Sequence, residues 1–405
     1  MCHRSSKAKL SGDSGAAALE LIGFPVSNTS LPIPKNAFLQ VRTMNSPQIN
    51  RRQFTSAITA AGICAATGGS ALANVELKKK LELGVDNFAV RAMGWKAEEL
   101  IDYAAKLNVD SMFITDLYAF RSLEDKALEE LKKKADDLNI NLYVGTWSIC
   151  PTSTRFKDEW GTAEEHLALG IRVAKGLGAS SIRVVLGGRT DRTTDGGIEA
   201  RIEDTVKVLK AMKSRAVDAG VKVAMENHAG DMHSLELVQL IEAAGKDLVG
   251  VNLDSGNAVW TMEDPLVNLE NLGPYTLTTS LRDTAVWESE NGITAQWTAM
   301  GEGMVDWEKY FARFVKLCPH APVNIETISG FNHEIAFKSE DYMKAWPKGK
   351  PAGFDKFAAW AKGGKPRAAH QRPEKVDPKK ADQDYQRGDI ERSIAYCKKI
   401  GLGRK

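Results

Sequence analysis

Three acidic residues end apolar runs of the sequence: Glu226 ends VKVAME, Asp254 ends VGVNLD and Glu326 ends VNIE. A carboxylate at the end of an apolar strand is costly unless it is paired with a cation or bound to a metal. Each acid alone has an ordinary alternative as a salt-bridged structural residue. Three acids at equivalent positions favour a shared site, in which their oxygens would bind a divalent cation.

The elements that must position these acids alternate between short β-rich runs and longer amphipathic runs. The predicted strands are residues 88–90, 111–114, 141–145, 181–186, 221–226, 249–254, 277–281 and 323–326. Eight alternations over about 250 residues predict an α/β fold, a (β/α)8 TIM barrel over residues 84–335. Barrel enzymes carry their chemistry at the C-terminal ends of the strands, so the acids are expected to converge there.

Residues 336–405 differ in character from the barrel. Lys-Gly-Lys-Pro and Gly-Gly-Lys-Pro interrupt them, a basic linker runs near 362–380, and a helix is expected over 389–400. We expect an arm of helix and loop that packs on the barrel. No GxGxxG motif follows the first predicted strand, which leaves a dinucleotide-binding fold without support.

The sequence resembles the xylose isomerase-like TIM-barrel family, the group of sugar phosphate isomerases and epimerases. The likeness rests on Glu-Asn-His from Glu226, Asp-Ser-Gly-Asn from Asp254 and the Ile-Glu of the last strand. It extends to MGEGMVDW over Met300–Trp307 and to the ending DIERSIAY over Asp389–Tyr396. The resemblance covers roughly residues 84 to 405, and its motifs are specific to the superfamily but not to one activity.

Members of that family typically hold a divalent metal through Glu, Asp, His and Glu from strands five to eight. Glu226, Asp254 and Glu326 carry over to this chain, but Ser280 stands where the family has histidine. The resemblance therefore implies a metal held by three carboxylates. The fourth ligand would be water, the weak ligand Ser280, or another side chain, with Gln296, His228 and His233 as candidates. Oxygen ligands favour Mn²⁺ or Mg²⁺ over Zn²⁺.

Such a metal would chelate a substrate carbonyl and its neighbouring hydroxyl, and so acidify the C–H between them. Glu226 and Glu326 are the expected catalytic pair that removes and returns the proton. Return to the opposite face gives an epimer, and transfer to the adjacent carbon gives an isomer. Expulsion of a β-substituent would make the protein a lyase. The side chains expected to contact the substrate are His228, Asn257, Arg282 and Trp147.

Composition narrows the function classes. Fifty-four basic and 52 acidic residues leave a net charge of +2, which provides no electrostatic footprint for nucleic acid. Seven histidines are too few for the trinuclear zinc site of the apurinic endonuclease branch of this fold. A metal-assisted sugar isomerase or epimerase is the leading hypothesis. The alternatives are a sugar lyase of the same fold and a catalytically silent carbohydrate-binding barrel that lost its metal with the histidine.

Residues 1–73 are predicted to be a presequence. Arg51-Arg52, an uncharged and mildly apolar run, and Ala71-Leu72-Ala73 resemble a twin-arginine (Tat) export signal. Processing would leave Asn74 as the new N-terminus, and Met44 is the expected true start. We therefore expect a periplasmic or otherwise exported protein without stable membrane insertion. An exported enzyme would act on a free sugar, a keto-sugar or a glycoside, because sugar phosphates are cytoplasmic metabolites.

Overall fold

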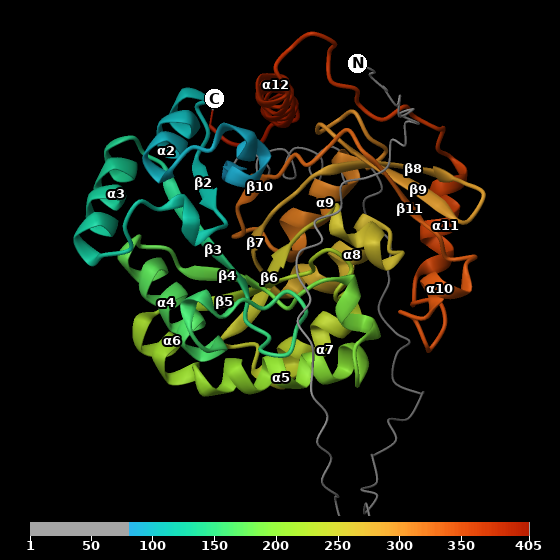
Figure 1. Cartoon of the computed structure of the whole chain (residues 1–405). Helices are drawn as coiled ribbons and strands as arrows, with labels where there is room; N and C mark the ends of the chain where they lie inside the picture. Colours follow the sequence, from blue (N-terminus) through green and yellow to red (C-terminus); the bar gives the residue numbers. More distant parts are fainter. Residues whose placement is uncertain (1–80, 405) are drawn as a thin grey trace, which may run out of the picture. The chain divides into compact units, whose positions relative to one another are not determined.

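The computed structural model describes residues 81–404. Eight parallel strands form its central sheet in the order β10-β1-β2-β3-β4-β5-β6-β7 (Figure 1). Their bounds are β1 Leu83–Asp86, β2 Ser111–Ile114, β3 Asn141–Ser148, β4 Ser181–Val185, β5 Lys222–Glu226, β6 Val249–Leu253, β7 Thr276–Thr279 and β10 Val323–Ile325. The Leu281 N–H donates to the Asn324 carbonyl at 2.8 Å, and the Glu326 N–H donates to the Leu281 carbonyl at 2.9 Å. These bonds join the two edge strands into a nearly closed TIM barrel, as the sequence predicted.

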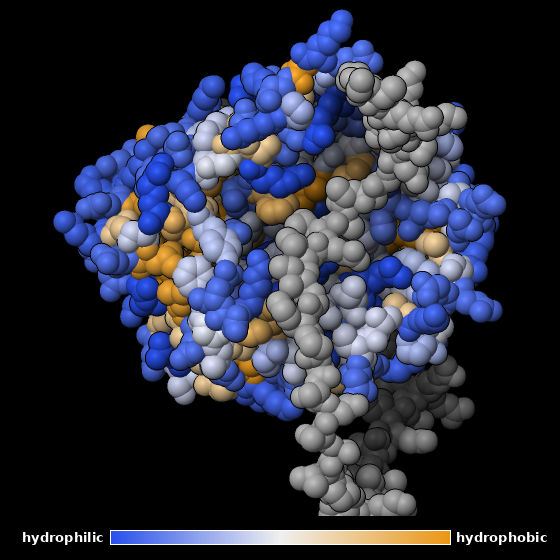
Figure 2. All heavy atoms as spheres, viewed as in Figure 1, coloured by the Kyte–Doolittle hydropathy of each residue, from blue (hydrophilic) through white to orange (hydrophobic). Residues whose placement is uncertain are grey.

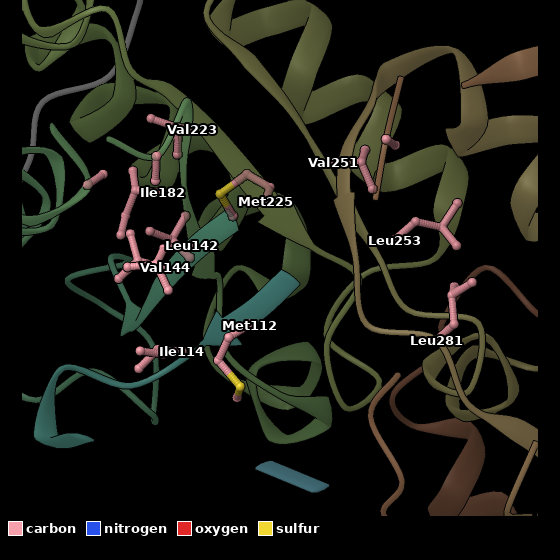
Figure 3. Close-up of a cluster of buried hydrophobic side chains, with 14 of the residues drawn as sticks. Met112, Ile114, Leu142, Val144, Ile182, Val223, Met225, Val251, Leu253 and Leu281 are labelled. Carbon is pink, nitrogen blue, oxygen red and sulfur yellow. The ribbon is translucent and has the colours of Figure 1, made fainter. Parts of the chain in front are cut away.

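Helices cover the outside of the barrel (Figure 1). They are α2 Ala97–Lys106, α3 Asp125–Asp137, α4 Ala163–Gly176, α5 Gly197–Ala211, α6 Lys213–Ala219, α7 Ser234–Ala244, α8 Pro265–Leu272 and α9 Trp307–Leu317. Alternate strand residues are apolar and pack into one buried cluster with the inner helix faces. Figure 3 shows ten of them, Met112, Ile114, Leu142, Val144, Ile182, Val223, Met225, Val251, Leu253 and Leu281.

Short 3-10 turns lie in several loops, and some helices begin at strong caps. The turns are η1 Asn87–Met93, η2 Leu117–Ala119, η3 Asp158–Trp160, η4 Arg189–Thr193, η5 Asn257–Thr261 and η6 Gly273–Tyr275. Helix α4 begins with a capping box, in which the Glu165 N–H donates to the Thr162 hydroxyl and the Thr162 N–H donates to the Glu165 carboxylate. Such caps fix where each helix starts relative to the strand before it.

The first strand lies earlier than the sequence prediction. Residues 88–90 belong to η1, and the strand is β1. Asp86 is the reason for the early end, because its carboxylate accepts a hydrogen bond from the Phe88 N–H at 2.9 Å and so caps the following turn. The correction places an acid at the end of β1 as well.

A small antiparallel sheet stands beside the barrel, and the sequence analysis missed it. It consists of β8 Asp283–Glu288, β9 Ile293–Thr298 and β11 Asn332–Ile335 in the order β11-β9-β8. The helices α10 Glu340–Met343 and α11 Phe354–Lys362 lie next to it (Figure 1). Side chains from both form a second hydrophobic cluster around Trp297 and Phe357. The first half of the predicted arm thus belongs to this second layer.

The last helix, α12 Pro378–Lys399, is longer than the predicted helix over 389–400 and packs on the barrel. Ile390, Ile394 and Cys397 are buried in the barrel cluster. The Met300 N–H donates to the Ser393 hydroxyl at 3.0 Å, which ties α12 to the loop that precedes α9.

The exposed face in Figure 2 is mostly hydrophilic, and hydrophobic side chains appear in smaller patches between the polar ones. Within residues 81–404, no helix combines the length and the apolar character that a membrane crossing requires. The predicted presequence, with Met44 and the Tat-like motif, lies outside the described residues.

Candidate active site

The three acids predicted to share a site meet at one end of the barrel. Glu226 is the last residue of β5, Asp254 follows β6 and Glu326 follows β10, so each stands at the C-terminal end of a parallel strand. All three are buried, with 2, 0 and 7% of their surfaces exposed. Burial at this depth requires compensating partners.

Arg282 is the shared partner of two of these acids. Its Nε donates to Asp254 Oδ1 at 3.1 Å, and its Nη2 donates to Asp254 Oδ2. The same Nη2 lies 3.3 Å from Glu326 Oε2. The guanidinium therefore occupies the space between the two carboxylates.

Glu226 has a different arginine. Arg183, from the interior face of β4, donates from Nε to Glu226 Oε2 at 2.5 Å, and Asn252 donates to the same oxygen at 2.8 Å. Asn257 donates from Nδ2 to Glu226 Oε1 at 3.2 Å and to Asp254 Oδ2 at 2.7 Å. Asn257 thus bridges two of the predicted acids.

The pKa values of the two expected catalytic acids shift in opposite directions. Burial alone would raise the pKa of Glu226, but the charge of Arg183, followed by His228 and Arg282, holds that pKa below its ordinary value. Burial raises the pKa of Glu326 well above its ordinary value, and the negative charges of Asp86, Asp254 and Glu226 raise it further. The positive charge of Arg282 offsets only part of this rise. Environments that push two carboxyl pKa values apart are how one site provides both a base and an acid.

Ser280, which replaces the family histidine, already has partners inside the barrel. Its hydroxyl donates to Asp86 Oδ2 at 2.9 Å and accepts from Asn252 Nδ2 at 3.1 Å. Gln296 lies on β9, outside the barrel, where its Nε2 donates to Asn332 Oδ1 at 2.8 Å and to the Ala368 carbonyl at 2.9 Å. Neither residue is placed as the fourth metal ligand that the sequence suggested.

The side chains at this end of the barrel do not form the predicted binding site for Mn²⁺ or Mg²⁺. Among residues 81–404, no three His, Cys, Asp or Glu side chains come together as a metal-binding group. The physical reason is the position of Arg282, whose N–H groups take up the Asp254 oxygens that a metal would need. Glu226, Asp254 and Glu326 thus each face an arginine.

His228 and Trp147 lie together at the rim. Their rings meet edge to face at 5.2 Å, and Trp147 Nε1 donates to the Arg155 carbonyl at 3.0 Å. His228 Nδ1 is 2.7 Å from the Gly187 carbonyl, an atom that can only accept, so the proton is on Nδ1 and Nε2 is an acceptor. Burial lowers the pKa of His228 to about 4, and the ring is neutral at neutral pH.

Sequence reasoning missed several residues that hold this site. Asn227 joins β5 to β6, because its Nδ2 donates to the Asp254 carbonyl and its Oδ1 accepts from the Asp254 N–H. Asp231 accepts from the His228 N–H at 3.0 Å and from the Gly187 N–H at 3.1 Å. Asp86 could have been found as a fourth acid ending a strand, but the first strand was placed too late.

Comparison with known proteins agrees with this architecture. The family model described as xylose isomerase-like TIM barrel matches residues 101–346. A 3-oxo-isoapionate decarboxylase from Pectobacterium atrosepticum is 21% identical over 211 residues, which are 52% of this chain and 69% of that protein.

Solved structures are similar to this chain as well, and the first of the two that follow supports the fold. A D-psicose 3-epimerase crystallised in the presence of D-fructose superposes with a TM-score of 0.51 at 15% identity, over 80% of this chain and 100% of the other. The IolI protein, whose crystal structure contains a bound zinc atom, has a TM-score of 0.48 at 14% identity, over 69% of this chain and 95% of the other. The family match spans more than half of the sequence, and this chain belongs to the xylose isomerase-like TIM barrel family.

Proposed function

We propose that this protein is a sugar isomerase or epimerase that moves a proton on the carbon next to a substrate carbonyl. The observation that carries the proposal is the pair Glu226 and Glu326, two buried carboxyl groups at one barrel mouth whose pKa values shift in opposite directions. The family and the fold shared with D-psicose 3-epimerase support sugar chemistry at this position.

In the proposed reaction, the ionised Glu226 removes the proton and the protonated Glu326 supplies one. Glu226 Oε1 is the freer oxygen, because it accepts one hydrogen bond of 3.2 Å, whereas Oε2 accepts bonds from Arg183 and Asn252. The C–H electron pair becomes a C=C bond, and the carbonyl π pair moves to the oxygen, which gives an enediolate. Return of a proton to the opposite face of the same carbon re-forms the carbonyl and yields an epimer. Return to the former carbonyl carbon, with transfer of the hydroxyl proton to the former carbonyl oxygen, yields an isomer.

The proposed substrate is a free sugar, a keto-sugar or a glycoside. At the rim, the unprotonated Nε2 of His228 would accept a hydrogen bond from a sugar hydroxyl, and the exposed part of Trp147 would pack on a sugar ring. Export through the Tat-like presequence, which we also propose, would keep the enzyme away from cytoplasmic sugar phosphates.

A decarboxylating lyase is the second candidate, favoured by the relative that is named a 3-oxo-isoapionate decarboxylase. Loss of CO₂ from a 3-oxo acid breaks the bond to the carboxylate carbon and leaves its electron pair as an enolate. A protonated Glu326 would then protonate the enolate carbon that had carried the carboxylate. This reaction needs an acid and a positive charge near the enolate, but no base.

Deuterium exchange tests the proposal. The full chain is incubated in D₂O with a panel of keto-hexoses, keto-pentoses and 3-keto-glycosides, and proton NMR follows loss of the signal next to the carbonyl. Glu226→Gln and Glu326→Gln should each slow exchange by about 100-fold or more, the usual contribution of a general acid or base. Glu129→Gln, on the exposed face of α3, is the matched control and should exchange like the wild type.

Release of CO₂ from a 3-oxo sugar acid, without exchange on neutral sugars, would favour the lyase. If no compound exchanges or loses CO₂, the enzyme proposals are wrong. A silent carbohydrate-binding barrel would then explain the site better.

A further inference from the structure

We propose that the guanidinium of Arg282 takes the place of a divalent cation in this barrel and polarises the substrate carbonyl group. The inference rests on the proposed function and names the electrophile that the proton transfer requires. It also follows from the misfit between the donor set and the metal that the family resemblance implied.

Arg282 is held rigidly from both its backbone and its side chain. The Ser255 hydroxyl donates to the Arg282 carbonyl at 2.9 Å and accepts from the Arg282 N–H at 3.0 Å. The side chain lies over Gly256, where an added Cβ would stand 2.3 Å from Arg282 Cγ. The Trp297 ring centre is 5.8 Å from the guanidinium carbon. A charge fixed in this way needs no reorganisation when the substrate reacts.

One amino group of Arg282 has no hydrogen-bond partner among the described residues and can donate to a substrate. Nε and Nη2 face Asp254 and Glu326, whereas Nη1 donates no hydrogen bond to any group in residues 81–404. An arginine has five N–H donors in one plane, and the two on Nη1 point away from the edge that faces the carboxylates. A substrate oxygen that accepts a hydrogen bond from Nη1 would lie beside the acids that transfer the proton.

The chemistry balances without a metal. Glu226 takes the proton from the carbon, the C–H electron pair becomes a C=C bond, and the carbonyl π pair moves to the oxygen. The Nη1 N–H groups donate to the resulting oxyanion, and Glu326 returns a proton to carbon as the carbonyl re-forms. A divalent ion bound to the Asp254 and Glu326 oxygens would stand next to the guanidinium and be repelled by it. One cation position can therefore hold either Arg282 or a metal, and here Arg282 holds it.

Metal binding is the first test, because it does not depend on finding the substrate. Calorimetry with Mn²⁺ and Mg²⁺, and elemental analysis of the purified full chain, should detect no stoichiometric metal in the wild type. The double variant Ser280→His/Arg282→Ala frees Asp254 and Glu326 and restores the family imidazole, so it should bind Mn²⁺. One Mn²⁺ per wild-type chain would overturn the inference, and so would a double variant that binds none.

Chemical rescue is the second test. Once a substrate is known, EDTA should leave wild-type deuterium exchange unchanged. Arg282→Ala should lower its rate by about 100-fold or more, which is what removal of one oxyanion donor costs. Added methylguanidinium should restore part of that rate, which a merely structural loss would not allow. Arg215→Lys, on the exposed side of α6, is the control.

The two proposals fail in different ways. Loss of exchange on EDTA treatment, with return on adding Mn²⁺, would refute the role of Arg282 and leave the sugar isomerase or epimerase intact. Absence of exchange with every compound would refute the enzyme. The metal titrations of the wild type and the double variant would still decide which cation this barrel holds.

Discussion

Two guanidinium groups and four carboxyl groups share the C-terminal end of this barrel. Arg183 bonds to Glu226 and Arg282 to Asp254, so each arginine has one principal acid. Asp86 has no arginine of its own, and burial raises its pKa to about 7. Burial also raises the pKa of Glu326, and the contact with Arg282 opposes that rise only in part. Protonation of these two acids lowers the excess of negative charge buried at this end of the barrel.

The Asp86 carboxyl group should make stability depend on pH. Its pKa is higher in the folded chain, about 7 against 3.8, so its stabilising contribution is complete below pH 3.8 and is lost as the pH rises through about 7. Asp86→Asn keeps an acceptor for the Phe88 N–H but cannot titrate. Between pH 4 and 7, the free energy of unfolding of the wild type should fall relative to this variant, by roughly 1–4 kcal/mol.

Urea unfolding at several pH values, followed by circular dichroism, measures this difference. Glu129→Gln serves as the control, because it removes an exposed acid that has no buried partner. Parallel stability curves for the wild type and Asp86→Asn would show that Asp86 is ionised in the folded chain at pH 7.

At the residue scale, sequence reasoning located the acids but not the arginine that lies between two of them. Glu226, Asp254 and Glu326 each end an apolar strand, and parallel strands in a barrel must bring such residues together. The pairing of Arg282 with Asp254 joins residues from different strand ends, and no local pattern encodes it. Gln296 was misplaced because the hairpin that carries it was not recognised.

At the element scale, the loop after β6 provides the surface on which the Arg282 side chain packs. Gly256 has φ −78°, which any residue can adopt, so the glycine is required only for space. An alanine Cβ would lie 2.3 Å from Arg282 Cγ and 2.5 Å from its Cδ, and the arginine would have to move away from Asp254. Gly256→Ala should therefore keep the fold and lower the deuterium exchange rate about 10- to 100-fold.

Gly188→Ala is the matched control, since its Cβ would meet no atom closer than 3.6 Å. A crystal structure of Gly256→Ala would show where the guanidinium goes. If the variant exchanges at the wild-type rate, Arg282 is not needed at its observed position.

Element prediction succeeded for the regular repeat of the barrel and failed for the hairpin inserted into it. The strand predicted over 111–114 is β2, and the strand predicted over 249–254 is β6 with one residue fewer. The β8–β9 hairpin carries the alternating run Ile-Thr-Ala-Gln-Trp-Thr, a period-2 signal that was available in the sequence. It was overlooked because a regular barrel has a helix, not a hairpin, after its seventh strand.

At the scale of the whole molecule, α12 is part of the barrel core. Ile390, Ile394, Cys397 and Leu402 are at most 3% exposed. Loss of one large buried aliphatic side chain costs about 2–5 kcal/mol, and a domain has only about 5–15 kcal/mol in total. A chain that ends at Asp377 should therefore be unfolded or insoluble, as judged by circular dichroism and sedimentation.

Ile394→Val, which removes one methylene, should cost only about 1 kcal/mol and stay folded. A soluble, cooperatively unfolding chain without α12 would show that the barrel is complete before Pro378.

The proposed export is also a property of the whole chain. If the Tat-like presequence is processed, protein from its native cells should begin at Asn74 and be recovered outside the cytoplasm. N-terminal sequencing and cell fractionation check this. Replacing Arg51-Arg52 with Lys-Lys should leave the precursor inside the cell, whereas an intact N-terminus at Met1 or Met44 in the native protein would contradict export.

Backbone contacts join the start of the barrel to the end of the chain. β1 pairs with β10, and the Gly403 N–H donates to the Leu81 carbonyl at 3.1 Å. A ribosome adds about 5–20 residues per second, so β1 waits at least about 10 s for its partner strand β10 to be synthesised. The barrel therefore closes only after most of its strands and helices have been made. Until then, the free edge of β1 is open to incorrect strand pairing.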